Sequence, residues 1–416
     1  TNFLTKFDAL HLKNKLYVII DEYDNFTNNL LGRNIDLFKK ILGTEDEGFV
    51  KSFYSVLKEK SGSIIDRIFI TGVCSVSLDS MTSGFNIGTN ITTDERFNAM
   101  TALTYDEVKE IIGVLNVTNK EELFNILVDN YDGYKFNEDV NYKVFNTTLA
   151  MYYLSSIYET GKAPRELIDS NIISNNHSQI STLINLVKSE MSNDIVNQIY
   201  FEDKITSSLK TSFDIDAMSL YDVLSMLFYF GYLTIEGYGP LGYAYRVPNE
   251  VIERVFNSYF KSFLEENGIK ISDNTLEEAM LELMNTGKIN LLSENVSKVI
   301  EMSSNRDLIN CNEQSIKQSY LTLLVNQLVF DVYSEYEVKN GYIDIMLFKK
   351  NKSLYDVMIE LKYIKKNEYN EKIYNEKLNE AKEQLNKYAE DERINKDKLK
   401  KYIVIFMGSD YNLIEV

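Results

Sequence analysis

The fold of the C-terminal part is decided by the stretch GYIDIMLF (residues 341–348), followed by IELK (residues 359–362). Both stretches are typical of β-strands, and a polar turn separates them. Side chains of successive residues point to opposite faces of a strand, so Glu360 and Lys362 share a face. If the two strands pair as an antiparallel hairpin, Asp344 reaches that face as well.

The flanking residues indicate that these strands, predicted over residues 342–349 and 353–362, lie in the middle of a sheet. They are apolar at Ile343, Ile345, Leu347, Val357, Ile359 and Leu361. Charged groups on central strands are partly buried, and a buried carboxylate is costly unless a metal or a lysine lies beside it. The alternative is a solvated ion pair on an exposed strand face, which arises often by chance in a chain with 25% charged residues.

Two carboxylates and one amine on neighbouring strands suit the metal-dependent cleavage of a phosphodiester. Carboxylate oxygens hold Mg2+ and leave positions for water and phosphate, and the cation lowers the pKa of its water. The ammonium of Lys362 can orient that water or stabilise charge on the phosphate. Asp344 and Glu360 repel each other without a cation, so one of them is expected to titrate above its ordinary pKa.

The composition excludes several other kinds of site. A chain of 416 residues with 44% hydrophobic content can form two or three domain cores. Two histidines, His11 and His177, and two cysteines, Cys74 and Cys311, argue against histidine-based triads, disulfide scaffolds and structural zinc. We found neither an apolar run of membrane length nor a cationic-apolar leader, so we expect a cytoplasmic protein without membrane contact.

Charge is distributed unevenly along the chain. The net charge of −18 argues against nucleic acid as a partner, because phosphate contacts need lysine and arginine. Residues 349–402, however, carry 15 Lys and Arg against 11 Asp and Glu, so the segment with the candidate site is mildly basic. For most of these lysines the simpler interpretation is a solvated helix face.

The N-terminal part reads as a parallel α/β sheet covered on both faces. Residues 16–20 and 67–72 are apolar runs of strand type, with helical periodicity over residues 34–60 between them. Asp21 and Glu22 follow the first run, which is the place where nucleotide hydrolases put a magnesium ligand and a water-polarising acid. The alternative is a strand end whose acids cap the following helix.

A nucleotide site also needs a glycine-rich loop that binds phosphate and ends in Lys-Ser or Lys-Thr. These 416 residues contain no such loop. The chain opens at Thr1, only fifteen residues before the first strand, so we expect the loop to be either cut away or absent. ATP is therefore expected as a ligand only if the loop lies upstream.

The remaining pattern is mainly helical. The pattern of residues 220–252 predicts helix, strand, turn, strand and helix, which is the order of a winged helix. We favour a role for this element in packing within the protein over a role in DNA binding. Further on, the pattern predicts a charged helical connector over residues 266–310, helices at 313–333 and 368–391, and a strand at 402–406.

These patterns divide the chain into segments that we expect at 1–165, 166–265, 266–305 and 306–416. The expected fold class is α/β.

With these residues placed, the chain resembles bacterial proteins that join an AAA-ATPase-like domain to a C-terminal PD-(D/E)xK nuclease domain. The resemblance rests on strings spread over nearly the whole chain. They are residues 18–24 (VIIDEYD), 69–72 (FITG), 78–87 (LDSMTSGFNI), Phe97, 131–136 (YDGYKF), 227–234 (LFYFGYLT), 247–250 (VPNE), Asn312-Glu313, 341–344 (GYID), 359–362 (IELK) and 381–385 (AKEQL).

The resemblance implies an identity for each segment of the chain. The expected domains are an AAA-like core at 1–165, a helical and winged-helix-like lid at 166–265, a connector at 266–305 and a nuclease-like domain at 306–416. The implied fold is a truncated P-loop/AAA-like parallel sheet, the lid, and a C-terminal restriction-endonuclease-like α/β domain.

The resemblance also implies roles for individual residues. Asp344, Glu360 and the backbone carbonyl of Leu361 would be metal ligands, and Lys362 the catalytic lysine. The proline that gives the superfamily its name is Ile343 here, a variation that leaves the ligand Asp344 intact.

Other matched positions have less specific readings. Glu313 resembles an extra acidic residue of these nucleases, with a favourable helix N-terminus as the alternative. Gln384 resembles a glutamine near the site, with a surface polar contact as the alternative. Asp21, Glu22 and Thr71 would be the Walker B-like nucleotide residues.

Three functions remain open on the sequence alone. The first is a Mg2+- or Mn2+-dependent nuclease, acting on DNA and joined to a degenerate or truncated nucleotide-binding module. The second is a non-catalytic interaction protein in which both sites are degenerate, with the acidic surface and 29 tyrosines serving partners. The third is an ATPase in which the nuclease-like core has only a structural packing role. The sequence leaves homo-oligomerisation open.

Overall fold

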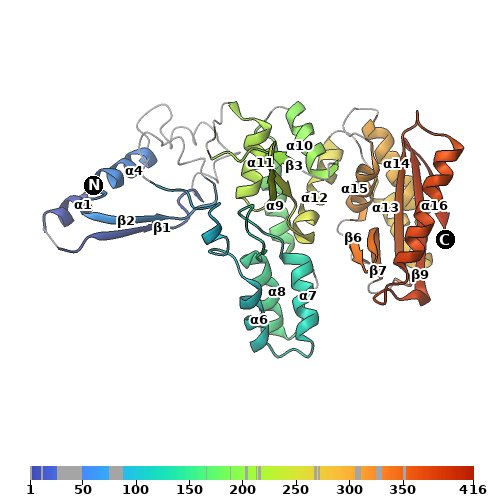
Figure 1. The fold of residues 1–416 in the computed structure, drawn as a ribbon, viewed down its shortest axis with the longest axis horizontal. Coiled ribbons are helices and arrows are strands. Elements are labelled where there is room, and N and C mark those ends of the chain that lie inside the picture. Colours follow the sequence, from blue (N-terminus) through green and yellow to red (C-terminus); the bar gives the residue numbers. More distant parts are fainter. Residues whose placement is uncertain are drawn as a thin grey trace. The chain divides into compact units, whose positions relative to one another are not determined.

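A computed structural model of the chain places its elements in the order drawn in Figure 1. It describes residues 2–10, 13–25, 49–74, 88–164, 166–187, 189–201, 205–211, 213, 217–266, 269, 272–304, 311–324, 330–349 and 353–416. The chain forms two compact units, one of residues 1–195 and 204–252, the other of residues 196–203 and 253–416. The division into four segments that we expect from the sequence stays a prediction.

The first unit begins with a two-stranded parallel sheet, as predicted. Strand β1 (Leu16–Ile20) pairs with β2 (Ile65–Ile70), and helices α1 (Asn2–Asp8) and α4 (Phe49–Lys60) pack on it. The predicted helical residues 34–48 and the string at 78–87 lie outside the described residues.

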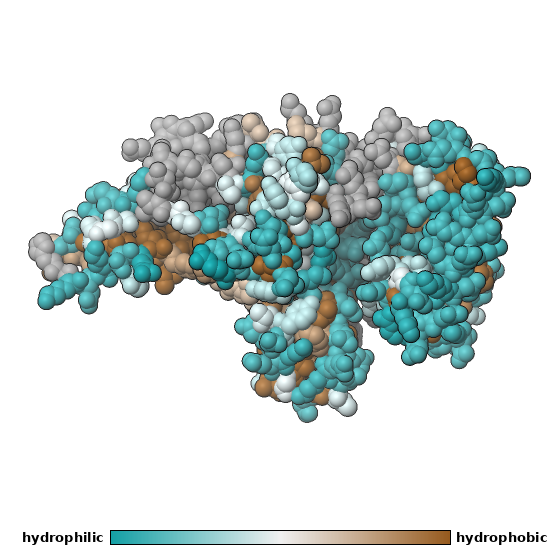
Figure 2. Space-filling view, viewed as in Figure 1, coloured by the Kyte–Doolittle hydropathy of each residue, from teal (hydrophilic) through white to brown (hydrophobic). Residues whose placement is uncertain are grey.

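Among the described residues, helices cover one face of this sheet, and the expectation that both faces are covered stays a prediction. Leu4, Tyr54 and Leu57 pack against one face of the strands. On the other face Tyr17 and Ile19 are 68% and 74% exposed, and Figure 2 shows the hydrophobic colouring over this lobe. The apolar residues of β1 therefore point alternately to the packed face and to the exposed face, because successive side chains of a strand point to opposite faces.

The rest of the first unit is mainly helical with a small antiparallel sheet of order β3-β5-β4. Its elements are η1 (Glu95–Phe97), α6 (Tyr105–Val114), α7 (Lys120–Tyr131), α8 (Thr147–Thr160), α9 (Ser170–Ile184), β3 (Ile205–Ser207), α11 (Leu220–Tyr229), β4 (Thr234–Gly239) and β5 (Gly242–Arg246). Helices α10 (Ser189–Phe201) and α12 (Glu250–Glu266) cross the boundary between the units.

The order α11, β4, β5, α12 is the order predicted from the sequence. The short strand β3 was not predicted, and it pairs with the far edge of β5. Buried Leu227, Phe228 and Tyr245 fill the space between α11 and the sheet. The winged-helix interpretation goes beyond this order and stays a prediction.

The second unit contains a five-stranded mixed sheet of order β10-β9-β8-β7-β6. Its strands are β6 (Phe330–Val338), β7 (Gly341–Lys349), β8 (Asp356–Ile364), β9 (Leu399–Met407) and β10 (Asp410–Glu415). Strand β8 lies at the centre, antiparallel to β7 and parallel to β9. The predicted hairpin and its central position are confirmed.

Further helices of this unit are α13 (Asp273–Thr286), α14 (Asn290–Ser304), α15 (Glu313–Leu324) and α16 (Glu371–Tyr388), with a short η3 (Lys396–Lys398) before β9. Helices α14, α15 and α16 contact strands of the sheet, and α13 packs against α14. Helix α16 contacts β7, β8 and β9 through Ala381 and Leu385. The Leu354 N–H donates to the carbonyl of Met284 on α13, so the segment predicted as a connector also contacts the sheet region.

The helix predicted over 313–333 was drawn too long. Helix α15 ends at Leu324, and strand β6 begins at Phe330. The prediction extended the helix into the strand because the apolar residues of β6 continue the apolar pattern of the helix. Polar residues Lys317, Gln318 and Thr322 are buried along with the apolar face of α15. In the described part, no helix has the length and apolar character needed to cross a bilayer.

Candidate functional site

The hairpin β7–β8 brings the predicted acidic residues to one face of the sheet. The register pairs Ile345 with Ile359 and Met346 with Met358, so the next position sets Asp344 opposite Glu360. Residues opposite each other on antiparallel strands share a face. Lys362 lies on that face too, two residues beyond Glu360.

The two strands separate at this point, and the Asp344 carboxylate fills the opening. Its Oδ2 accepts a hydrogen bond from the backbone N–H of Leu361 at 2.7 Å, in place of a ladder bond between the strands. The N–H and C=O of one strand residue point to the same side of the strand. The carbonyl of Leu361 therefore also points toward the β7 side, where the sequence places a third oxygen ligand.

Glu360 and Lys362 form a buried ion pair. Lys362 Nζ lies 2.8 Å from Glu360 Oε1, and the two residues are 5% and 2% exposed. The second carboxylate oxygen, Glu360 Oε2, is also buried and has no hydrogen-bond partner among the described residues. A buried acceptor without a donor is costly, so this oxygen calls for a ligand such as an ion or water.

The pKa values of the cluster reflect this burial. Burial, and then the charge of Asp344, raise the pKa of Glu360 to about 7. Burial likewise raises the pKa of Asp344 above its ordinary value. The expected repulsion between the two acids is seen at Glu360, whose pKa the charge of Asp344 raises. For Lys362, burial acts to lower the pKa, but the charges of Glu360, Glu313 and Asp344 outweigh it and raise the pKa. Lys362 is therefore an ammonium at neutral pH.

Helix α15 brings Glu313 to the same region. Burial raises the pKa of Glu313, and the charges of Lys362 and Asp344 act on it from close by. A backbone hydrogen bond from Tyr363 holds its carboxylate. Glu313 is the first residue of the helix, so both readings made from the sequence, a site acid and a helix N-terminal acid, are compatible with its position.

Helix α16 contributes Gln384 and also Tyr388, which sequence analysis missed. The Gln384 side chain hydrogen-bonds the hydroxyl of Tyr388, and charges of Glu360 and Asp344 act on that hydroxyl. Gln384 Oε1 is shielded from solvent and has no partner in the described part. The spacing of four residues, which puts both side chains on one helix face, could have indicated Tyr388.

These residues fit a divalent cation through their oxygen atoms. The carboxylates of Asp344 and Glu360 and the carbonyl of Leu361 supply the hard oxygen ligands that Mg2+ and Mn2+ prefer. Oε2 of Glu360 has no hydrogen-bond partner among the described residues and is available to a cation. Within the described ranges, no three His, Cys, Asp or Glu side chains come close enough together to hold a metal by themselves. A cation here would need backbone and water ligands as well, as Mg2+ commonly does.

The N-terminal candidates lie at the tips of β1 and β2. The hydroxyl of Thr71 hydrogen-bonds Asp21 Oδ1, and the Glu22 N–H donates to the same hydroxyl at 3.2 Å. Glu22 adopts a left-handed backbone with φ 49°. Buried Asp24, which sequence analysis did not single out, accepts the N–H groups of Val73 and Cys74 at 2.9 and 2.6 Å. The structure thus brings Asp21, Glu22 and Thr71 together.

Thr71 also lines a cavity of about 450 Å³ in the first unit. Aromatic residues Phe97, Phe136 and Phe228 form much of its wall, and Thr147 at the start of α8 lies on it as well. An apolar cavity with a few polar groups is the usual form of a small-molecule site. Of the predicted nucleotide residues, Thr71 therefore borders a space that can accept a ligand.

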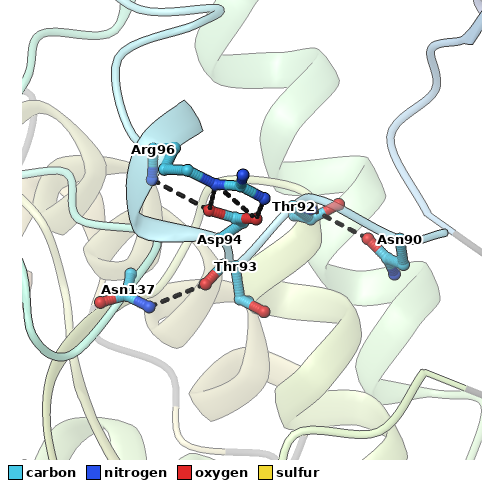
Figure 3. A network of polar contacts seen from close by, with 6 residues as sticks. All are labelled: Asn90, Thr92, Thr93, Asp94, Arg96 and Asn137. Carbon is cyan, nitrogen blue, oxygen red and sulfur yellow. Dashed lines mark hydrogen bonds and ion pairs between the residues drawn. The ribbon is translucent and has the colours of Figure 1, made fainter.

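A polar network fixes one wall of this cavity (Figure 3). Asp94 accepts hydrogen bonds from the backbone and the guanidinium of Arg96, which hold the pKa of Asp94 at about 2. The Asn137 side chain donates to the carbonyl of Thr93 at 2.8 Å. The network ties the segment around η1 to the loop that carries Phe136.

Comparisons with known proteins agree with the two ends of the chain. The sequence model of the family described as PD-(D/E)XK nuclease superfamily matches residues 311–416. The one described as Predicted AAA-ATPase matches residues 2–82. A search of curated proteins found no match. The resemblance seen in the sequence is thus confirmed: the chain carries an AAA-ATPase-like segment at its N-terminal end and a PD-(D/E)XK nuclease superfamily domain at its C-terminal end.

Proposed function

We propose that residues 311–416 form a Mg2+- or Mn2+-dependent nuclease that cleaves DNA. The observation that carries the proposal is the buried Oε2 of Glu360, which has no hydrogen-bond partner among the residues that the structure describes. It lies opposite Asp344 and next to the Lys362 ammonium. Such an arrangement is costly in a protein that binds nothing there.

The residues divide the work in the following way. Asp344, Glu360 and the carbonyl of Leu361 would hold the cation, which supplies a water of lowered pKa and neutralises charge on the phosphate. Lys362 stays protonated, so it donates hydrogen bonds to the phosphate or to the attacking water and does not act as a general base. Gln384 and Tyr388 close the site on the side of α16.

The basic character of residues 349–402 supports a nucleic-acid substrate. Lys365 and Lys366 follow directly after β8, and Lys372 lies in the first turn of α16. The side chains of the three lysines are 65%, 80% and 86% exposed. Exposed lysines next to the site can contact the phosphate backbone without reading its sequence. DNA remains our proposal for the substrate.

For the N-terminal segment we propose a nucleotide-binding ancestry, with Asp21, Glu22 and Thr71 as the nucleotide-facing residues. Binding of ATP would need a phosphate loop, which these 416 residues do not contain. ATP is therefore proposed as a ligand only if such a loop lies upstream, and the catalytic function proposed here is that of the C-terminal domain.

A cleavage assay tests the nuclease proposal. Plasmid, linear duplex and single-stranded DNA are incubated with the protein in Mg2+, Mn2+ or EDTA. We expect cation-dependent cleavage that Lys362→Ala and Glu360→Gln each lower at least 100-fold, with Lys298→Ala, an exposed lysine of α14, as the matched control. Cleavage that survives the combined Lys362→Ala and Glu360→Ala change would reject the proposal. An inactive wild-type protein that binds no cation would favour the non-catalytic alternative.

A further inference from the structure

Helix α15 carries a second buried lysine that the proposed reaction does not use. Lys317 is 6% exposed, although lysine is almost never fully buried without a partner. Its Nζ lies 2.5 Å from Oε1 of Glu335 on strand β6. Glu313 and Lys317 are four residues apart, so both project from the same side of α15 toward the site.

Glu335 has an unusual backbone for a strand residue. Its φ is 50°, in the left-handed region that costs energy for any residue with a Cβ. The pairs on either side, Ser334 with Ile345 and Tyr336 with Ile343, keep a regular register, and no pair forms at Glu335 itself. That register sets Glu335 opposite Asp344. The ion pair with Lys317 accompanies this local departure from strand geometry.

Asp344 therefore lies between two other acids, Glu335 on β6 and Glu360 on β8. Each side has its own cation nearby. Lys362 pairs with Glu360, and Lys317 pairs with Glu335 while its positive charge acts on Asp344 and lowers the pKa of that carboxyl. In a two-metal site, a second divalent ion lies about 3.5–4 Å from the first and adds positive charge. Here the Lys317 ammonium supplies positive charge beside Asp344 and Glu335.

We propose that the Lys317 ammonium is a built-in cation that takes the place of a second divalent ion beside Asp344 and Glu335, so that the domain holds one divalent ion, at Asp344 and Glu360. Lys317 is in this sense a positioning residue, because it acts through the carboxylates and does not touch the substrate. The inference rests on the proposed function, since it assumes that Asp344 and Glu360 bind a cation.

The stoichiometry of Mn2+ binding tests this inference on the full chain. Mn2+ is titrated at neutral pH into wild type, Lys317→Met, Glu335→Gln and the double variant, and free Mn2+ is followed by electron paramagnetic resonance. We expect one ion per chain for wild type and for Glu335→Gln, two for Lys317→Met, and one for the double variant, which lacks the second carboxylate. Lys298→Met is the matched control and should bind one ion. Circular dichroism and thermal unfolding confirm that each variant is folded.

Each outcome has a separate meaning. Two ions bound by wild type overturn the inference, and this measurement does not depend on whether Lys317→Met folds. One ion bound by a folded Lys317→Met also overturns it. In both cases the proposed function stands. No ion bound by wild type overturns the proposed function itself.

Discussion

Asp344 and Glu360 stand opposite each other on β7 and β8, one position beyond the paired residues Ile345 and Ile359. The strands separate there because the Asp344 carboxylate, and not a backbone carbonyl, accepts the N–H of Leu361. The opening leaves an oxygen of Glu360 buried, with no hydrogen-bond partner in the part of the chain that the structure describes. A break in an otherwise regular ladder thus creates the space in which a cation can bind.

The metal-free protein should lose stability as the pH rises from 4.5 to 7. The pKa of Glu360 is about 7 in the fold, against 4.5 ordinarily, so in this window the folded state holds a proton that the unfolded chain has released. The raised pKa of Asp344 acts in the same direction. The loss is at most about 3 kcal/mol. Hydrogen exchange of residues 356–364 in EDTA at pH 5 and pH 7.5 measures it.

Glu360→Gln provides the control for this pH dependence, since the amide does not titrate. Its exchange rates, corrected for the intrinsic effect of pH, should differ less between the two pH values than those of wild type. Protection that grows toward pH 7.5 in the wild type would contradict the assigned direction. Cation affinity should show the opposite trend and fall below pH 7, because the proton competes for the carboxylate.

Replacement of the three exposed lysines after β8 should weaken DNA binding in a salt-dependent way. Each phosphate contact contributes a slope of about 0.9 to the dependence of log affinity on log salt, so Lys365→Ala, Lys366→Ala and Lys372→Ala together should lower the slope by up to about 3. Fluorescence anisotropy with labelled duplex in Ca2+, at 50–200 mM salt, measures the slope. An unchanged slope in the triple variant would show that the DNA does not contact these three lysines.

Gly341→Ala should destabilise the second unit more than Gly408→Ala. Gly341 has φ 147°, and an added Cβ would lie 2.7 Å from the ring and hydroxyl of Tyr388. Gly408 has φ 69°, and its nearest neighbour is the flexible Lys366 at 3.7 Å. We expect a loss of about 2–4 kcal/mol at Gly341 and about 1 kcal/mol at Gly408. Urea denaturation measures both, and equal losses would show that Tyr388 does not restrict the turn.

The sequence was sufficient for the strands that carry the acids. Continuous apolar runs around Asp344, around Glu360 and before Asp21 predict buried strands, and these strands were found with the predicted pairing. Strand β6 was not recognised, because a short apolar run after a helix does not distinguish strand from helix. Strand β10 was missed because its exposed edge gives a weak alternation of apolar residues.

Other parts of the site could not be predicted for physical reasons. A lysine in a helix is exposed in most proteins, so the burial of Lys317 depends on tertiary contacts that the local pattern does not contain. The left-handed backbone of Glu335 has no sequence signal, since glycine or asparagine is the usual residue there. Sequence analysis singled out Asp21 and Glu22 but not Asp24. The Asp24 carboxylate accepts the N–H groups of Val73 and Cys74 and so connects the end of β1 to the segment after β2.

Isothermal titration calorimetry with Mn2+ tests the central claim, that Asp344 and Glu360 share one divalent cation, most directly. Wild type and Asp344→Asn are titrated at pH 7.5, with Asp410→Asn, an exposed aspartate at the start of β10, as the matched control. We predict binding by wild type and Asp410→Asn and at least a 10-fold lower affinity for Asp344→Asn. Equal affinity in all three proteins, or no binding by wild type, would contradict the account.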